Sequence, residues 1–298
     1  MVLWVNMIMV YLLITGICFG SFINALVWRI HEQQNTVYTS SFKKHKSTSS
    51  LKYSPSSVKS KEMSIVSGRS MCPNCRHQLS AIDLIPILSW LQLRGKCRYC
   101  HATYEDTPVT EIVTPLLFVI SYIYWPLAWN YSSVLLFVIW LIFVVSFVAL
   151  VIYDIRWLLL PNRIVVPLFF LSLVHVFIMG TIYHGGVSAI LGAVYGLLIG
   201  GGIFFVLFHV PGKELIGGGD VKLGAVLGLL VGGPWPALLL LFMASCLGSL
   251  FSLPLLITGK ANRGSKIPFG PFLIAATIIV YLFGSSIIAW YKKLLMIG

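Results

Sequence analysis

Charged residues are scarce in this chain of 298 residues, since only 10% are Asp, Glu, Lys or Arg. A soluble globular domain has about a quarter, so the shortage excludes an ordinary soluble enzyme, a disordered tail and a fibrous protein. Apolar residues make up 58%, and the mean hydropathy is +0.90. We therefore expect lipid to solvate most of the chain, whose length is better counted in membrane spans of about 20 residues each.

Acidic residues are rarer still, with 9 Asp and Glu against 21 Lys and Arg, and the net charge is +12. From residue 112 onward only three acids occur: Asp154, Glu214 and Asp220. Glu214 lies in a polar turn and is interpreted as a solvated surface charge. The other two lie at the edges of apolar segments (VIYDIRWLLLPN and LIGGGDVKLGAVLG), where an acid is costly and therefore indicates a function. The alternative is an interfacial acid paired with Arg156 or Lys222.

Eight apolar segments predict an all-α polytopic membrane protein with about eight transmembrane segments: residues 4–28, 109–128, 133–153, 163–182, 186–209, 221–232, 235–257 and 268–290. The first is longer than a signal-peptide core and lacks a basic region before it, so we interpret it as a retained helix. With both termini outside, the loops 29–108, 154–163, 210–222 and 258–267 are cytoplasmic. They hold 19 of the 21 basic residues, as expected for cytoplasmic loops. The Ser/Lys-rich stretch from His31 to Ser67 is interpreted as a flexible loop.

This orientation places Asp154 and Asp220 at the same depth on the cytoplasmic side. Two carboxylates brought together cannot both ionise cheaply, so that one keeps a proton while the other activates water. Three glycines, Gly217, Gly218 and Gly219, precede the second acid and leave the backbone open to an approaching substrate strand. The pattern predicts an aspartic-protease pair, Asp154 and Asp220.

Four of the six cysteines form two C-x-x-C units, Cys72 with Cys75 and Cys97 with Cys100. This spacing is typical of a structural zinc site with four thiolates, whereas disulfides are disfavoured in a cytoplasmic loop. Free thiols or a redox pair are the alternatives. His77 and His101 are interpreted as bystanders, and the two single cysteines, Cys18 and Cys246, as packing residues. The stretch between the units is apolar, which favours packing on the bilayer over nucleic-acid binding.

Several stretches, in order along nearly the whole chain, resemble the type IV prepilin peptidases, which are membrane aspartyl proteases of the GxGD class: FGSFINALVWRI, CPNCRHQLSAIDLIPILSWLQLRGKCRYCHATY, DIRWLLLPN, GGGDVKLGAVLG and IPFGPFL. The resemblance implies a bacterial enzyme of the cytoplasmic membrane that cuts the basic leader, after a Gly, from prepilins or pseudopilins used for pili, secretion or DNA uptake. It assigns catalysis to Asp154 and Asp220 and matches the family's cysteine cluster.

The resemblance also implies methylation of the new N-terminus with S-adenosylmethionine, although no G-x-G-x-x-G loop is present. Glu111 matches an acidic position in the N-terminal half, where the helix dipole alone would also favour an acid. We predict two domains: residues 1–108, with the first span, the basic loop and the zinc module, and residues 109–298, the peptidase. The expected partners are prepilins and lipid headgroups, with no nucleic acid.

Two other functions fit parts of the sequence. A transporter with a cytoplasmic zinc module would explain intramembrane acids and a short Gly-rich span. Transport sites, however, lie near the bilayer midplane, and no repeat symmetry is visible between the halves. A membrane-tethered zinc-ribbon protein that binds nucleic acid would leave Asp154 and Asp220 unexplained.

Overall fold

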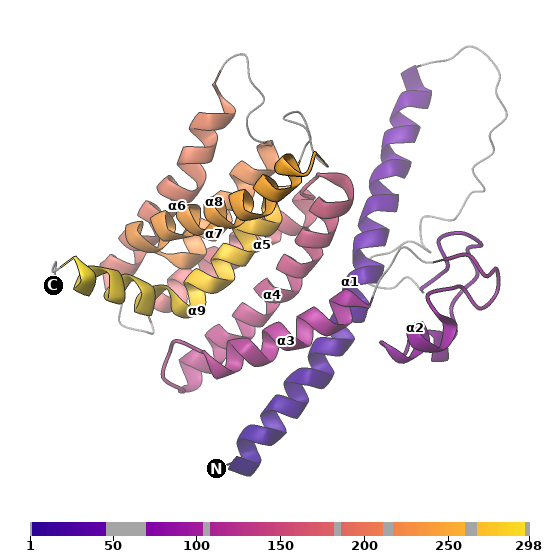
Figure 1. Ribbon diagram of the computed structural model, residues 1–298, viewed down its shortest axis with the longest axis horizontal. Coiled ribbons are helices and arrows are strands. Elements are labelled where there is room, and N and C mark those ends of the chain that lie inside the picture. Colours follow the sequence, from indigo (N-terminus) through magenta and orange to yellow (C-terminus); the bar gives the residue numbers. More distant parts are fainter. Residues whose placement is uncertain are drawn as a thin grey trace. The chain divides into compact units, whose positions relative to one another are not determined.

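The structure is a computed structural model that describes residues 2–45, 70–103, 108–181, 186–210, 217–259 and 267–295. Its elements are α1 (Val2–His45), the 3-10 helix η1 (Ile82–Leu84), α2 (Leu88–Leu93), α3 (Val109–Ile123), α4 (Tyr131–Trp157), α5 (Asn162–Thr181), α6 (Gly186–Phe208), α7 (Gly218–Val231), α8 (Pro234–Ile257) and α9 (Gly270–Leu294) (Figure 1). Two isolated β-bridges are the only extended pairings among these residues. The predicted all-α class is confirmed.

Each of the eight predicted apolar segments is a helix. Six of them, α1, α4, α5, α6, α8 and α9, are long and apolar enough to cross a membrane. Their outer faces carry large exposed apolar side chains, such as Phe177, Phe242 and Leu250, as expected where lipid is the solvent. The helices α3 and α7 are shorter, at 15 and 14 residues. The chain is thus a multi-pass membrane protein.

Helix α1 is longer than the apolar run that predicts it. The apolar run predicts that the first span ends at Arg29, and the composition predicts a flexible loop from His31, whereas the helix continues to His45. The physical reason is that residues 31–45 contain no Pro or Gly and include the helix formers Glu32, Gln33 and Gln34. The rest of the Ser/Lys-rich stretch, residues 46–67, lies outside the described residues.

The chain divides into two compact units, Met1–Val119 and Ile120–Gly298. In the first unit, α1 crosses the beginning of α3 at two glycines. A Cβ added at Gly16 would lie 2.5 Å from Pro115 Cα, and one added at Gly20 would lie 2.6 Å from Glu111 Cα. These two backbones therefore approach each other more closely than any larger residue would allow.

The second unit is built around α4. Asn130 begins this helix by accepting a hydrogen bond from the Ser133 N–H at 2.7 Å, which satisfies a free donor of the first turn. Large side chains with no more than 2% exposure line the helix: Leu136, Trp140, Phe143, Phe147, Leu150 and Tyr153. Helix α4 contacts α5 and α9, so it forms the packed interior against which the neighbouring spans are fixed.

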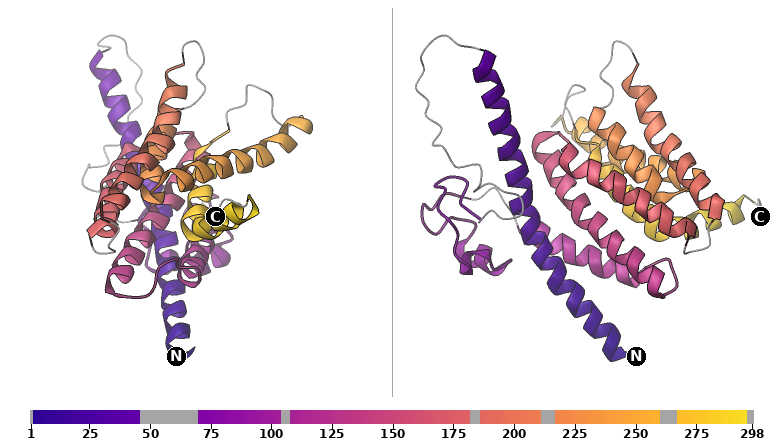
Figure 2. Two further views of the ribbon diagram at one scale, coloured as in Figure 1. Left: turned by 90° about the vertical axis from the view of Figure 1, so that its left-hand side faces the viewer. Right: turned by 180° about the vertical axis from the view of Figure 1, so that it is seen from behind.

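Helices α6 and α7 meet through glycines spaced four residues apart. A Cβ at Gly228 would lie 2.2 Å from the Gly196 carbonyl oxygen, and one at Gly224 would lie 2.5 Å from that of Gly200. Small residues at this spacing let membrane helices pack backbone to backbone. Helix α7 also contacts α5, α8 and α9 (Figure 1 and Figure 2). This short helix is therefore covered by protein, which satisfies the requirement for a short helix at membrane depth.

Candidate active site and metal centre

Asp154 lies in the last turn of α4. The helix ends at Leu158, whose left-handed backbone (φ 54°) lets its N–H bond the Asp154 carbonyl oxygen at 2.8 Å. The Asp154 residue is only 5% exposed. Its carboxylate Oδ2 accepts a hydrogen bond of 3.1 Å from the backbone N–H of Gly270, the first residue of α9. The carboxylate is therefore held in place by the end of a different helix.

Asp220 lies in the first turn of α7, where an acid is favoured by the helix dipole. The apolar run predicts that this helix begins at residue 221, and that the three glycines before Asp220 leave the backbone open to a substrate strand. Instead, α7 begins at Gly218, and only Gly217, the N-cap, has extended backbone (φ −70°, ψ 141°). Gly218 and Gly219 belong to the first helical turn, because an acid in that turn is favoured by the helix dipole and extends the helix beyond its apolar run.

The two acids are brought together around Leu160, in the connection between α4 and α5. A Cβ added at Gly219 would lie 3.0 Å from the Leu160 Cβ, and one added at Gly270 would lie 3.7 Å from its Cδ2. Leu160 therefore lies against Gly219, the neighbour of Asp220, and against Gly270, which bonds Asp154. That Asp154 and Asp220 act together as a pair stays a prediction.

The alternative interpretation paired each acid with a nearby base. Both ion pairs found among the described residues lie in the first unit and involve neither acid. Lys222 instead donates a hydrogen bond of 3.0 Å to the Asn162 side-chain oxygen, which joins α7 to the start of α5. Arg156 lies over the Trp157 ring, 6.0 Å from its centroid. Among the described residues, neither Asp154 nor Asp220 is therefore in an ion pair with a base.

Gly270 is a residue of this site that the sequence analysis missed. The IPFGPFL stretch carried part of the resemblance, but nothing in it indicated a contact with Asp154, 116 residues away. Every residue except proline has a backbone N–H, so the sequence does not show which residue will donate one to Asp154. The only available signal was a glycine followed by Pro271, a residue preferred in the first turn of a helix.

The four cysteines form one cluster. Their Sγ atoms all lie within 4.8 Å of one another, and those of Cys72 and Cys100 are 3.8 Å apart. Zinc–sulfur bonds of about 2.3 Å in a tetrahedron place the sulfurs about 3.8 Å apart, so the arrangement fits a single four-coordinate metal ion. No other group of three or more metal-ligating side chains was found among the described residues.

The two C-x-x-C units share one backbone design. The Cys72 N–H bonds the His77 carbonyl and the Arg76 N–H bonds the Cys72 carbonyl, each at 2.9 Å. The second unit repeats both bonds, from Cys97 to Ala102 and from His101 to Cys97, at 2.9 and 3.0 Å. Arg76 and His101 both have a φ of 56°, and this left-handed residue turns each chain back so that both thiols point inward.

The remaining candidates lie away from both sites. His77 contacts the Tyr99 ring at 3.8 Å and belongs, like His101, to no metal-ligating group among the described residues. Cys18 and Cys246, which are interpreted as packing residues, are exposed on apolar helices. Lipid accepts such a side chain as readily as the core does. Glu214 lies outside the described residues.

Together, the described residues define a polytopic all-α membrane protein with a carboxylate pair at helix ends and a four-cysteine metal-binding cluster. Residues 14–125 match the bacterial peptidase A24 N-terminal domain, and residues 135–253 match the type IV leader peptidase family.

Two similar relatives are each described as a prepilin leader peptidase/N-methyltransferase. The protein of Aeromonas salmonicida is 30% identical over 295 residues, covering 98% of this chain and 96% of the relative. That of Bacillus subtilis is 33% identical over 233 residues, covering 78% and 88%. No solved structure gives a significant match. This chain belongs to the type IV prepilin leader peptidase family.

Proposed function

We propose that this chain is an aspartyl endopeptidase that removes the basic leader from type IV prepilins or pseudopilins, with Asp154 and Asp220 as its catalytic residues. The observation that supports the proposal is that Asp154 is 5% exposed in the last turn of α4, and that Leu160 lies near both Gly270, which bonds Asp154, and Gly219, which precedes Asp220. Burial of a carboxyl group without a basic partner is costly, and such groups concentrate at catalytic sites.

The two carboxyl groups share one proton and divide the chemistry between them. The ionised carboxylate takes a proton from water while the water oxygen attacks the carbonyl carbon of the scissile peptide bond, and the protonated carboxyl gives its proton to the carbonyl oxygen. When the C–N bond breaks, the leaving amine receives a proton from the pair. The hydrogen bond from Gly270 to Asp154 orients one carboxylate for this step.

The helix ends that carry the acids are placed at the cytoplasmic face of a bacterial cytoplasmic membrane, with both chain termini outside. The distribution of basic residues supports this orientation. A prepilin presents its basic leader at the same face, so the scissile bond reaches the acids without crossing the membrane. Exposed Ile82, Leu88 and Leu91 in the cysteine-bearing segment favour contact with lipids over nucleic acid.

The first unit performs the second step, methylation of the new N-terminus from S-adenosylmethionine. The name shared by the relatives supports this step. The four-cysteine cluster holds a structural zinc ion, since four thiolates leave no open position for a reacting molecule. The transporter alternative is disfavoured because Asp154 and Asp220 lie in the terminal turns of their helices, away from the middle of a span.

The test is cleavage of a prepilin by the purified full-length protein, followed by the mass of the product. Asp154→Asn and Asp220→Asn should each abolish loss of the leader, because Asn keeps the size of Asp but neither takes nor gives a proton. Glu214→Gln, at an acid interpreted as solvated, should be almost silent. Cleavage by either Asn variant at close to the wild-type rate would reject the assignment.

A further inference from the structure

Five apolar side chains are exposed between the two C-x-x-C units, within residues 82–93, which we call the apolar segment. This segment contains η1, α2 and the turn between them. The five are Ile82, Leu84, Ile85, Leu88 and Leu91, which are 58, 42, 42, 63 and 60% exposed. Exposed apolar side chains that gather in one stretch mark an interaction surface. Neither the carboxylate pair nor the metal cluster accounts for this surface.

The apolar segment is attached to the part of α1 that lies inside the predicted first span. The Ile87 N–H donates a hydrogen bond of 2.5 Å to Glu111 Oε2, and Glu111 lies in the first turn of α3. The α3 backbone meets α1 at Gly20, where an added Cβ would lie 2.6 Å from Glu111 Cα. Gly20 precedes Trp28, the end of the predicted span, by eight residues, or about 12 Å along the helix axis. The segment therefore lies at the level of apolar α1.

The first C-x-x-C unit is attached to a different part of α1. Arg76, directly after this unit, forms an ion pair of 3.2 Å with Glu32. Glu32 lies twelve residues beyond Gly20, or about 18 Å further along the helix axis, in the polar continuation of α1. The cysteine-bearing module therefore extends along α1, with the apolar segment at the level of the span and the first C-x-x-C unit at the level of water.

The surfaces of α1 and α3 near this contact are also apolar. Phe19 and Phe22 of α1 are each 45% exposed, and Val109 and Ile112 of α3 are 55 and 47% exposed. Lipid is the expected solvent for such side chains on membrane helices. The bilayer that covers them is therefore also within reach of the apolar segment, which favours lipid over a protein partner as its occupant.

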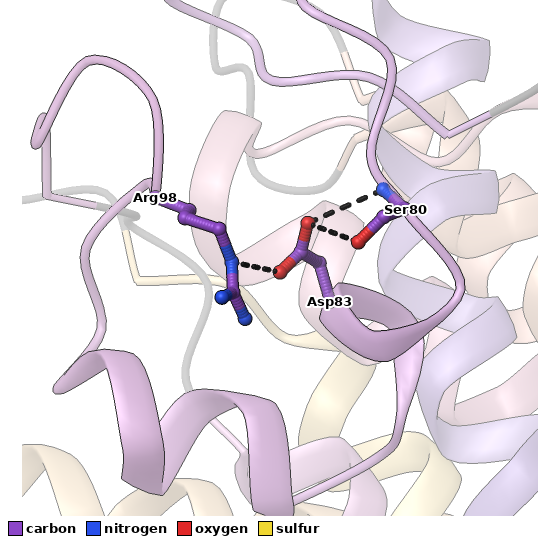
Figure 3. Close-up of polar contacts among 3 residues, drawn as sticks. All are labelled: Ser80, Asp83 and Arg98. Carbon is purple, nitrogen blue, oxygen red and sulfur yellow. Dashed lines mark hydrogen bonds and ion pairs between the residues drawn. The ribbon is translucent and has the colours of Figure 1, made fainter.

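The acid of the apolar segment is turned inward (Figure 3). Asp83 is the only acid between the two C-x-x-C units, and its side chain is 2% exposed. Its carboxylate accepts hydrogen bonds from the Ser80 N–H and hydroxyl and from Arg98 Nε, at 3.2, 2.8 and 2.7 Å. Because Arg98 belongs to the second C-x-x-C unit, this ion pair ties the apolar segment to the metal cluster and keeps the acid away from the exposed surface.

Two bases follow the apolar segment directly. Arg94 and Lys96 are exposed, and neither is in an ion pair among the described residues. Bases at this position complement the phosphate groups of anionic lipids. Elements that combine exposed apolar side chains with bases lie in the membrane interface, where the apolar side enters by about 5–10 Å.

We propose that the apolar segment is an interfacial membrane element, with Ile82, Ile85, Leu88 and Leu91 entering the leaflet at which α3 begins. This inference extends the lipid contact proposed above to one element and its depth, and it does not depend on leader removal or methylation. The element holds the metal cluster at the membrane through the inward ion pair. Its apolar side chains are covered by acyl chains, and the bases that follow it face the headgroups.

Fluorescence quenching of the full-length protein in lipid nanodiscs tests the proposal. Cys18→Ala and Cys246→Ala remove the two single thiols, and Leu88→Cys or Leu91→Cys adds one thiol for labelling with bimane. Label on the protein without an added cysteine is subtracted as background. The nanodiscs contain phosphatidylcholine and phosphatidylglycerol, with or without bromine on the acyl chains. Both labels should lose about half of their emission or more to brominated lipid, as expected for side chains that enter by about 5–10 Å, and should be protected from iodide in the water.

Two matched controls bracket the result. Gln78→Cys, at an exposed position two residues from Arg76, should be quenched by iodide and not by brominated lipid. Phe242→Cys, at a position 64% exposed on α8, should respond to brominated lipid as the labels at Leu88 and Leu91 do.

Three outcomes would overturn the proposal. The first is iodide quenching at Leu88 and Leu91 as strong as at Gln78, which would place the segment in water. The second is protection from both quenchers, which would show that protein covers the segment. The third is equal quenching by brominated lipid at Gln78, which would remove the distinction between the two ends of the module. Quenching as expected in a protein that cleaves no prepilin would support the membrane element and reject only the proposed function.

Discussion

Gly270→Ala isolates the placement of one catalytic carboxylate. The substitution keeps the backbone N–H that bonds Asp154 and adds only a methyl group. That carbon would lie 2.6 Å from Asp154 Oδ2, 0.8 Å inside the 3.4 Å at which ordinary contact begins. The carboxylate must therefore move by most of an ångström. Since a misplacement of about 1 Å can cost about a hundredfold in rate, we expect kcat for leader removal to fall roughly 10- to 100-fold, with KM little changed.

The control is Gly202→Ala on α6, where an added Cβ meets nothing within 4 Å. It should cleave prepilin at the wild-type rate, and both variants should unfold near the wild-type Tm. Single-turnover cleavage with a saturating prepilin measures the chemical step directly. A Gly270→Ala enzyme with wild-type kcat would refute this reasoning. Catalysis would then tolerate a displacement of the Asp154 carboxylate that a precisely positioned catalytic group could not tolerate.

Three further outcomes are expected. Metal analysis of the wild type should find a single zinc ion, and Cys72→Ser combined with Cys75→Ser should lose it. The double change should lower Tm and methylation more than cleavage; full zinc occupancy in that variant would contradict the site. Gly228→Ala should destabilise the membrane unit by about 1–3 kcal/mol or more through overpacking, because its Cβ would lie 2.2 Å from the Gly196 carbonyl oxygen; a Tm like that of Gly202→Ala would count against this packing. The orientation is tested in a background in which Cys18 and Cys246 are replaced. In intact cells, a cysteine introduced by Thr258→Cys should be shielded from an impermeant thiol reagent, and a cysteine introduced by Leu294→Cys should be labelled. The opposite labelling pattern would reverse the orientation.

Local patterns in the sequence were sufficient to predict the membrane helices and the metal ligands. Apolar runs of span length appear as helices because the bilayer permits few other structures. The two C-x-x-C units come together because each carries its own turn, closed by hydrogen bonds within about five residues. Each of these features depends on residues close in sequence, so spacing alone predicts it.

Features that depend on distant contacts were not predictable in the same way. Glu111 meets Ile87, 24 residues away, through a backbone N–H, and no residue type marks such a donor. His175 and Tyr281, which are 106 residues apart, form a part-buried hydrogen bond of 2.8 Å. Each appears in the sequence as a single polar residue in an apolar run, so the pairing has no local signal. The end of α1 differs from the prediction because the polar composition of residues 31–45 resembles that of a loop. These residues contain no Gly or Pro, so the helix continues through them.

The central claim is that leader removal and methylation use separate sites, with Asp154 and Asp220 serving only the first. The most direct measurement is the product mass when purified Asp154→Asn and Asp220→Asn enzymes receive S-adenosylmethionine and either an intact prepilin or the same peptide already lacking its leader. We predict no leader loss from the intact prepilin and a normal methyl gain on the shortened peptide. Loss of both reactions in a folded, zinc-containing variant, or continued cleavage, would contradict the claim.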